Sequence, residues 1–111
     1  MKKILLIVTF LITNIFAFEH LTAENIDEKI KDKKVIIDFY ATWCPPCKII
    51  SKNLNSFEDI KPKDVVVYKI DIDAQRDLIK RFDVKSIPTI VFLDNGEIKH
   101  LQVGVQTVDD L

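Results

Sequence analysis

The sequence predicts a single α/β domain with a mixed central sheet flanked by helices. Strand-like and helix-like segments alternate along the chain, and parallel strands need a crossover whereas antiparallel strands need only a turn. The last two strand-like segments flank an Asn-Gly dipeptide, the strongest short-range hairpin signal. With 111 residues, of which 48% are hydrophobic and 30% charged, the chain can form one small core but not two.

The first 17 residues have the layout of a secretory signal peptide. Two lysines after Met1 precede an uncharged apolar run that extends to Phe18. We expect cleavage after Ala17, which leaves residues 18–111 as the mature domain, exported to the bacterial periplasm. An uncleaved anchor facing the periplasm is the alternative, because Ile15 stands where a small residue is favoured, although the run is short for a span of ~20 residues. A buried amino-terminal helix or strand is a further alternative.

The charge balance argues against a nucleic-acid partner. The chain has 16 Lys and Arg against 17 Asp and Glu, and removal of Lys2 and Lys3 with the leader leaves 14 against 17. Basic and acidic residues alternate along the polar stretches, whereas a protein that neutralises phosphates needs a basic stripe. The charges indicate a solvated surface.

The first elements of the mature domain are a short helix and a buried strand. Thr22 is a plausible N-cap for an amphipathic helix over residues 23–30, with Ile26 and Ile30 four positions apart. The β-branched and aromatic run 35–41 is typical of a strand buried on both faces of a parallel sheet. Asp38 in the middle of this strand is the anomaly.

The apolar spacing places the remaining elements. Pro45 and Pro46 suit the first turn of a helix, where their missing N–H groups have no intrahelical use. The expected elements are a helix over 45–57, a strand over 65–72, a helix over 74–82, and hairpin strands over 90–93 and 97–103.

Cys44 and Cys47 are the two cysteines of the chain, and their spacing favours chemistry over structural stapling. Cys44 lies between a predicted strand end and a helix N-terminus, where free N–H groups and the helix dipole stabilise a thiolate. Cys44 would attack a disulfide and Cys47 would resolve the mixed disulfide. An inert disulfide, or a metal site completed by His20 and His100, is the alternative.

The Trp-Cys-Pro-Pro-Cys-Lys segment 43–48, the strand before it and the later Ile87-Pro88-Thr89 resemble the thioredoxin family. The resemblance covers essentially all of the mature chain. It implies the thioredoxin fold, with strand order 1-3-2-4-5 and antiparallel strands 4 and 5, and dithiol–disulfide exchange with protein substrates. No cofactor is implied, because the two sulfurs store the electrons.

The resemblance also assigns catalytic roles to Asp38 and Lys69. Asp38 matches the family's buried acid, and burial in an apolar strand is expected to raise its pKa so that it can take a proton from Cys47. Lys69 matches the partner that modulates this acid. A merely structural ion pair, or side chains that reach solvent at a strand end, is the alternative.

A second set of residues is expected to contact substrate. Pro88 matches the family's cis-proline, beside which the Ile87 backbone is free to pair with an extended segment. The expected substrate-binding residues are Trp43, Pro45, Pro46, Ile87, Pro88 and Gly104.

The sequence departs from the family pattern in two places. Pro45 stands where the commonest thioredoxins carry Gly, and neither residue between the cysteines offers an N–H or is a His, which favours a reducing dithiol. Seven residues follow Gly104 in the sequence, so the final helix looks truncated to about one turn and one sheet face is expected to be partly bare.

These observations predict an exported, monomeric protein-disulfide reductase that receives electrons from a membrane-embedded thiol donor. Its substrates would be proteins with disulfides or thiols. The alternatives are a disulfide oxidase or isomerase, and a non-catalytic peptide- or metal-binding module on the same fold.

Overall fold

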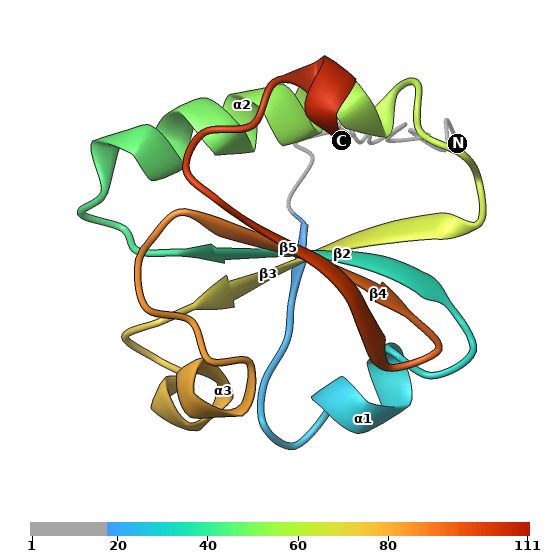
Figure 1. Ribbon diagram of the computed structural model, residues 1–111, viewed down its shortest axis with the longest axis vertical. Helices are drawn as coiled ribbons and strands as arrows, with labels where there is room; N and C mark the ends of the chain where they lie inside the picture. Colours follow the sequence, from blue (N-terminus) through green and yellow to red (C-terminus); the bar gives the residue numbers. More distant parts are fainter. Residues whose placement is uncertain (1–17) are drawn as a thin grey trace, which may run out of the picture.

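The computed structural model describes residues 18–111, which form a five-stranded mixed sheet with helices on both faces (Figure 1). The strand order is β1-β3-β2-β4-β5. The strands are β1 (Glu19–His20), β2 (Lys34–Tyr40), β3 (Val65–Asp71), β4 (Thr89–Asp94) and β5 (Glu97–Val103). The parallel pairing of β2 with β3 and the antiparallel pairing of β4 with β5 confirm the predicted fold class and strand order.

The predicted signal peptide occupies residues 1–17 of the sequence. The predicted leader and its cleavage point lie outside the described residues. None of the helices within residues 18–111 has both the length and the apolar character that a membrane crossing requires.

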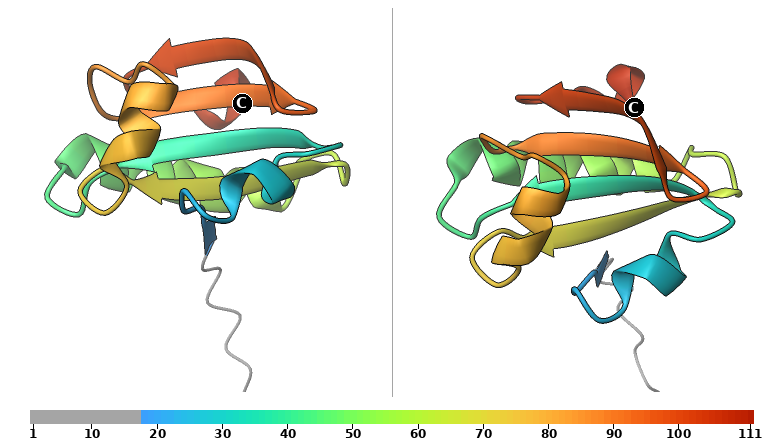
Figure 2. Two further views of the ribbon diagram at one scale, coloured as in Figure 1. Left: turned by 90° about the horizontal axis from the view of Figure 1, so that it is seen from below. Right: turned by 60° about the horizontal axis from the view of Figure 1, so that its bottom comes forward.

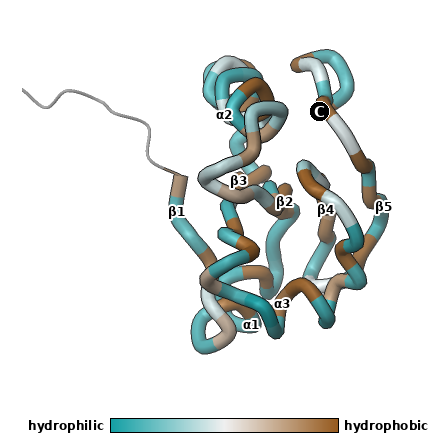
Figure 3. Tube along the Cα trace, turned by 90° about the vertical axis from the view of Figure 1, so that its left-hand side faces the viewer, coloured by the Kyte–Doolittle hydropathy of each residue, from teal (hydrophilic) through white to brown (hydrophobic). Residues whose placement is uncertain are grey.

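The helices form one layer on each face of the sheet (Figure 2). α1 (Ile26–Lys29) and α3 (Arg76–Arg81) cover one face. α2 (Pro45–Glu58) and the 3₁₀ turn η1 (Val108–Asp110) cover the other. Figure 3 shows the sheet edge-on between these two layers.

Alternation along β2 divides its side chains between two cores. Val35, Ile37 and Phe39 point toward α1 and α3, while Ile36 packs with Ile50, Leu54 and Phe57 of α2. Successive strand residues face opposite sides, so Asp38 shares the α2-facing side with Ile36. A carboxyl group therefore lies in the layer between the sheet and α2.

Two predicted helices are shorter in the structure. The segment from Thr22 begins with a turn in which Thr22 and Asn25 exchange side chain–backbone hydrogen bonds, and the α-helix starts only at Ile26. The helix predicted over 74–82 begins at Arg76, because the N–H groups of residues 74 and 75 both bond to the Asp71 carbonyl in a preceding turn. Local side-chain and turn bonding replaced the first helical turn in both places.

The hairpin turn between β4 and β5 confirms the Asn-Gly prediction. Asn95 and Gly96 both have positive φ, at 50° and 80°, as a type I′ turn requires. The Asn95 side chain accepts a hydrogen bond from the Asp32 N–H, and its own N–H donates to the Lys33 carbonyl. The turn is thereby tied to the loop before β2.

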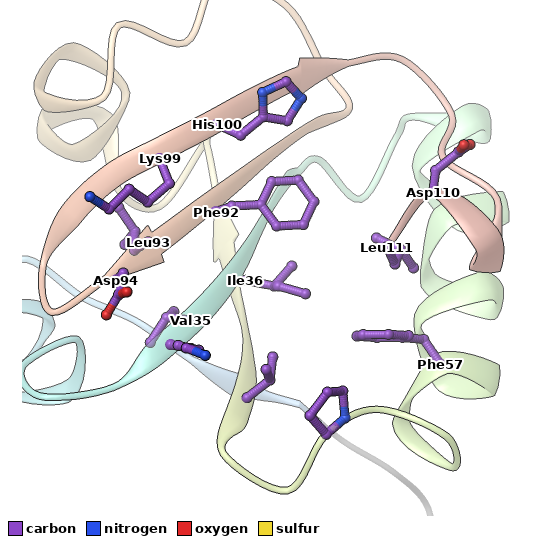
Figure 4. A pocket seen from close by; sticks show the side chains of 13 residues that line it. Val35, Ile36, Phe57, Phe92, Leu93, Asp94, Lys99, His100, Asp110 and Leu111 are labelled. Atoms are coloured by element: carbon purple, nitrogen blue, oxygen red, sulfur yellow. The ribbon is translucent and has the colours of Figure 1, made fainter.

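Beyond Gly104 the chain crosses to the α2 face and forms the single turn η1, so the expectation of about one helical turn holds for the described residues. An open groove of about 510 Å³ lies beside η1 (Figure 4). Ile36, Phe57, Phe92 and Leu111 form part of its apolar lining. The groove therefore lies toward the carboxyl end of α2, away from the cysteines at the other end.

Candidate active site

The two cysteines form a disulfide bond at the amino end of α2. Cys44 is the N-cap residue with extended backbone (φ −102°, ψ 105°), and Pro45 and Pro46 occupy the first two helical positions. The Cys47 N–H donates a hydrogen bond to Cys44 Sγ over 3.3 Å. Since the prolines have no N–H, this bond is the contact that the first helical turn offers to the Cys44 sulfur.

Both cysteines are buried, with exposed fractions of 4% for Cys44 and 2% for Cys47. They pack with Ala41, Tyr40, Ile72 and Ile87 in a small apolar cluster. The disulfide thus lies just beneath the surface.

Trp43 covers the neighbouring surface. Its side chain is 65% exposed, and its indole N–H donates to Asp73 Oδ2 over 2.8 Å. Asp73 follows β3, and its own N–H donates to Asp71 Oδ1. The sequence reasoning missed Asp73, because an acid in a polar loop carries no signal until the fold brings it to the tryptophan.

The residues around Pro88 lie beside the cysteines. The Ile87–Pro88 peptide bond is cis, the isomer that the resemblance implies, and Ile87 packs on the cysteine cluster. Ile87 takes part in none of the backbone hydrogen bonds found among the described residues. The Gly104 N–H donates to the Pro88 carbonyl over 2.9 Å, which places Gly104 next to this segment. Gly104 has φ 95°, and a Cβ built on it meets nothing within 4 Å.

Asp38 is completely buried between the sheet and α2. Burial raises the pKa of its carboxyl group from 3.8 to about 6, and the Lys69 ammonium opposes part of this rise. Asp38 and Lys69 are register partners in the parallel pair of β2 and β3, and Lys69 Nζ lies 3.7 Å from Asp38 Oδ2. The structure therefore brings together the predicted acid and its predicted cation.

Lys69 has two further neighbours. Its ammonium lies 4.5 Å from the centroid of the Tyr40 ring and donates a hydrogen bond to the Ser51 hydroxyl. Tyr40 in turn shares a 2.6 Å hydrogen bond with His20 Nε2. Burial raises the pKa of the Tyr40 hydroxyl, and the nearby Asp71 and Asp38 carboxylates add to this rise. Neither Ser51 nor Tyr40 was among the residues expected from the sequence.

The histidines lie apart from the cysteines. His20 is on the edge strand β1, and His100 lies on β5 against Phe92, with 5.7 Å between ring centroids. Within residues 18–111, three His, Cys, Asp or Glu side chains gather nowhere in a metal-binding arrangement. The arrangement gives no support to a metal site built from His20, His100 and the two cysteines.

A disulfide that caps a helix, flanked by a segment with free backbone groups and accompanied by a buried acid, is the site of a thiol–disulfide oxidoreductase. The family model described as Thioredoxin matches residues 17–111. The chain belongs to the thioredoxin family.

Curated relatives agree with this assignment. Thioredoxin H3 of Arabidopsis thaliana is 41% identical over 75% of this chain and 74% of the relative. Thioredoxin of Mycoplasmoides gallisepticum is 33% identical over 78% of this chain and 87% of the relative. Thioredoxin-T of Drosophila melanogaster is 39% identical over 73% of this chain, which spans 54% of that longer protein.

Proposed function

We propose that the protein is a protein-disulfide reductase that acts outside the cytoplasm. The observation that carries the proposal is the Cys44–Cys47 disulfide at the amino end of α2, beside the unpaired backbone of Ile87. The sulfurs supply the electrons, and the free backbone supplies a place for an extended substrate segment.

The first step is attack by the reduced protein on a substrate disulfide. The Cys44 thiolate bonds to one substrate sulfur, the substrate S–S bond breaks, and the other substrate sulfur leaves as a thiolate. The helix dipole and the Cys47 N–H stabilise the Cys44 thiolate before attack. Ile87 pairs with the extended substrate backbone and Trp43 contacts its surface, together with Pro45, Pro46, Pro88 and Gly104.

The second step releases the substrate. Cys47 loses its proton and attacks Cys44 Sγ; the bond between Cys44 Sγ and the substrate sulfur breaks, this substrate sulfur leaves as a thiolate, and the Cys44–Cys47 disulfide forms. Asp38 takes the proton, because a carboxyl group with a pKa of about 6 is a competent base near neutral pH. Two electrons have passed from the protein to the substrate, whose disulfide has become two thiols.

The reducing direction is supported by the composition of the first helical turn. Pro45 and Pro46 provide no N–H to a Cys44 thiolate, so one backbone N–H, that of Cys47, bonds to this sulfur. Moderate thiolate stabilisation is typical of a reducing dithiol, because strong stabilisation of the reduced form makes a protein an oxidant.

The proposed location follows from the first 17 residues of the sequence, and it determines the electron source. An extracytoplasmic compartment favours disulfides and offers no soluble nicotinamide-dependent supply. We therefore propose a membrane-embedded thiol donor, which returns two electrons to the Cys44–Cys47 disulfide after each turnover. We further propose that the protein acts as a monomer.

The first test is the equilibrium reduction potential of the cysteine pair, followed by Trp43 fluorescence in defined thiol buffers. A reductase is expected near the roughly −270 mV of thioredoxin. A potential of about −120 to −180 mV would instead make the protein an oxidase or isomerase. The absence of any redox transition would remove the catalytic proposal.

Cysteine variants test the assigned roles. Cys47→Ser should accumulate a mixed disulfide with a substrate protein, and Cys44→Ser should abolish insulin reduction. If the protein is instead a non-catalytic peptide-binding module, the wild-type protein should not reduce insulin. Both cysteine variants should then bind extended peptides as well as wild type does. Intact mass of the exported protein tests the location, and a mass that still includes residues 1–17 would contradict cleavage.

A further inference from the structure

Ser51 lies on the inner side of α2 at the point where the helix crosses the acid–cation pair. The buried residues Cys47, Ile50 and Leu54 mark the face of α2 that packs on the sheet. Ser51 is one turn after Cys47 and so shares its side of the helix. A serine on this face brings a hydroxyl into the layer that contains Asp38.

The Ser51 hydroxyl accepts a 2.5 Å hydrogen bond from Lys69 Nζ. The same ammonium lies over the Tyr40 ring and 3.7 Å from Asp38 Oδ2. A separation of 3.7 Å allows strong Coulomb attraction but exceeds hydrogen-bonding distance. Neither Asp38 oxygen accepts a hydrogen bond from any group of residues 18–111.

The Lys69 ammonium is closer to the Ser51 hydroxyl than to the Asp38 carboxyl group. A charge-assisted bond to a carboxylate is about twice as strong as a neutral one, so an unconstrained ammonium at this site would close onto Asp38. The ammonium instead bonds to the Ser51 hydroxyl and lies over the Tyr40 ring. Its side chain is 13% exposed, which leaves little water to replace either partner.

We propose that Ser51 is a positioning residue, which holds the Lys69 ammonium out of hydrogen-bonding distance of Asp38 and so keeps this carboxyl able to accept a proton. The role rests on the proposed function, in which Asp38 takes the proton of Cys47. Ser51 acts through Lys69 and touches neither sulfur nor substrate in this role.

The charged and titratable groups around Asp38 come from several elements. β3 contributes Lys69 and β2 contributes Tyr40, while Cys47 lies on the buried face of α2. Asp71 and His20 act on Tyr40 from β3 and β1. β4 places the apolar Ile90 opposite Asp38. Burial is the largest influence on the Asp38 carboxyl group, and Lys69 carries the positive charge that opposes it, so the position of Lys69 affects how readily the acid ionises.

Removing the hydroxyl is expected to lower the pKa of Asp38. The carboxylate becomes the nearest remaining acceptor for the ammonium, and the separation shortens from 3.7 Å toward the hydrogen-bonded distance of about 2.8 Å. At an effective dielectric constant of about 20, this change in Coulomb attraction corresponds to about one pKa unit. Asp38 would then be a weaker base.

The test follows the NMR chemical shift of the Asp38 carboxyl carbon across the pH range, in oxidised and in reduced protein, and obtains the pKa of Asp38 from it. Ser51→Ala and Ser51→Val should lower the pKa of Asp38 by about one unit. Ser51→Thr, which is isosteric with Val but keeps a hydroxyl, should leave it near the wild-type value. Ser56→Ala is the matched control, since Ser56 is an exposed serine of the same helix whose hydroxyl donates to the Lys52 carbonyl.

A Lys69→Met variant should move the pKa of Asp38 in the opposite direction, upward. The acidic midpoint of mixed-disulfide release should move down with the pKa in Ser51→Ala. An unchanged or raised pKa in both Ser51→Ala and Ser51→Val would overturn the role of Ser51 even if wild type reduces insulin. If wild type fails to reduce insulin while the predicted shifts are found, the proposed function fails and the positioning of Lys69 by Ser51 stands.

Discussion

Replacing Asp38 by Asn removes a buried carboxyl group whose ionisation opposes folding. The side chain is fully buried, and its volume is nearly unchanged by the substitution. Burial holds the pKa of Asp38 at about 6 in the folded chain, against an ordinary value of 3.8. The folded protein therefore binds a proton more tightly at this site than the unfolded chain does.

The sign of the pH effect follows from this difference. Because the folded state binds more protons between pH 4 and 6, the stability of wild type falls as pH rises through this window. Above the folded pKa the loss is complete and amounts to about 3 kcal/mol for a difference of about two pKa units. Asp38→Asn lacks this loss, so it should be more stable than wild type at pH 8 by up to about 3 kcal/mol.

The assay is denaturant unfolding of the oxidised proteins at pH 3.5, 5, 6.5 and 8. The difference between Asp38→Asn and wild type should grow across this series. At pH 3.5 the side chain at position 38 is neutral in both folded proteins. Lys69 then lacks a charged partner in each of them, so the free-energy cost of its unpaired charge is the same in both and cancels in the comparison. Asp59→Asn, an exposed substitution at the end of α2, is the control for loss of one negative charge.

A difference in stability that is the same at pH 3.5 and pH 8 would refute this reasoning. It would mean that Asp38 ionises at the same pH in the folded and unfolded chains. The same variant should slow release of the mixed disulfide, because an amide cannot accept the proton of Cys47. Unchanged release across neutral pH would remove Asp38 from the mechanism without affecting the stability result.

Three further outcomes are expected. Gly104→Ala should destabilise the protein by about 1–3 kcal/mol in denaturant unfolding, because φ is 95° there; an unchanged midpoint would show that the backbone relaxes. Leu54→Ala should cost about 2–5 kcal/mol in the same assay, whereas Ile49→Ala, at a 53% exposed position of the same helix, should cost far less; equal losses would contradict the packing of α2. Asp73→Ala should raise the KM for insulin with little change in kcat, because the Trp43 indole loses its hydrogen bond; an unchanged KM would show that this bond does not orient the substrate surface.

The fold was predictable where local chemistry and long-range packing agree. The β-branched and aromatic run 35–41 before the cysteines has the pattern of a buried strand, and the Asn-Gly dipeptide fixes the conformation of the turn and the register of the hairpin. The first helix was less predictable, since the Thr22 and Asn25 side chains bond to the backbone and delay its start to Ile26. Such competition between side chain and backbone is not visible in apolar spacing.

The candidate site was predictable in its chemistry and only partly in its neighbours. The cysteines carry a spacing signal, and Asp38 stands out as a charge within an apolar strand. Ser51 and Asp73 carry no comparable signal, because polar residues in helices and loops are usually solvated. Their roles arise only when α2 packs on the sheet and the loop after β3 meets Trp43.

The register between β2 and β3 makes the chemistry of this site inseparable from the alignment of two strands. Asp38 faces Lys69 because these strands are paired as they are. A slip of one residue would turn Asp38 to the opposite face of the sheet, the side on which Tyr68 and Val91 of the neighbouring strands are buried. Insertions within either strand should therefore separate Asp38 from Lys69, whereas a change in the length of the loop of residues 59–64 should leave this pairing in place. Under the proposed function, the register of β2 with β3 is constrained by the chemistry of the acid, and the length of the loop between α2 and β3 is not.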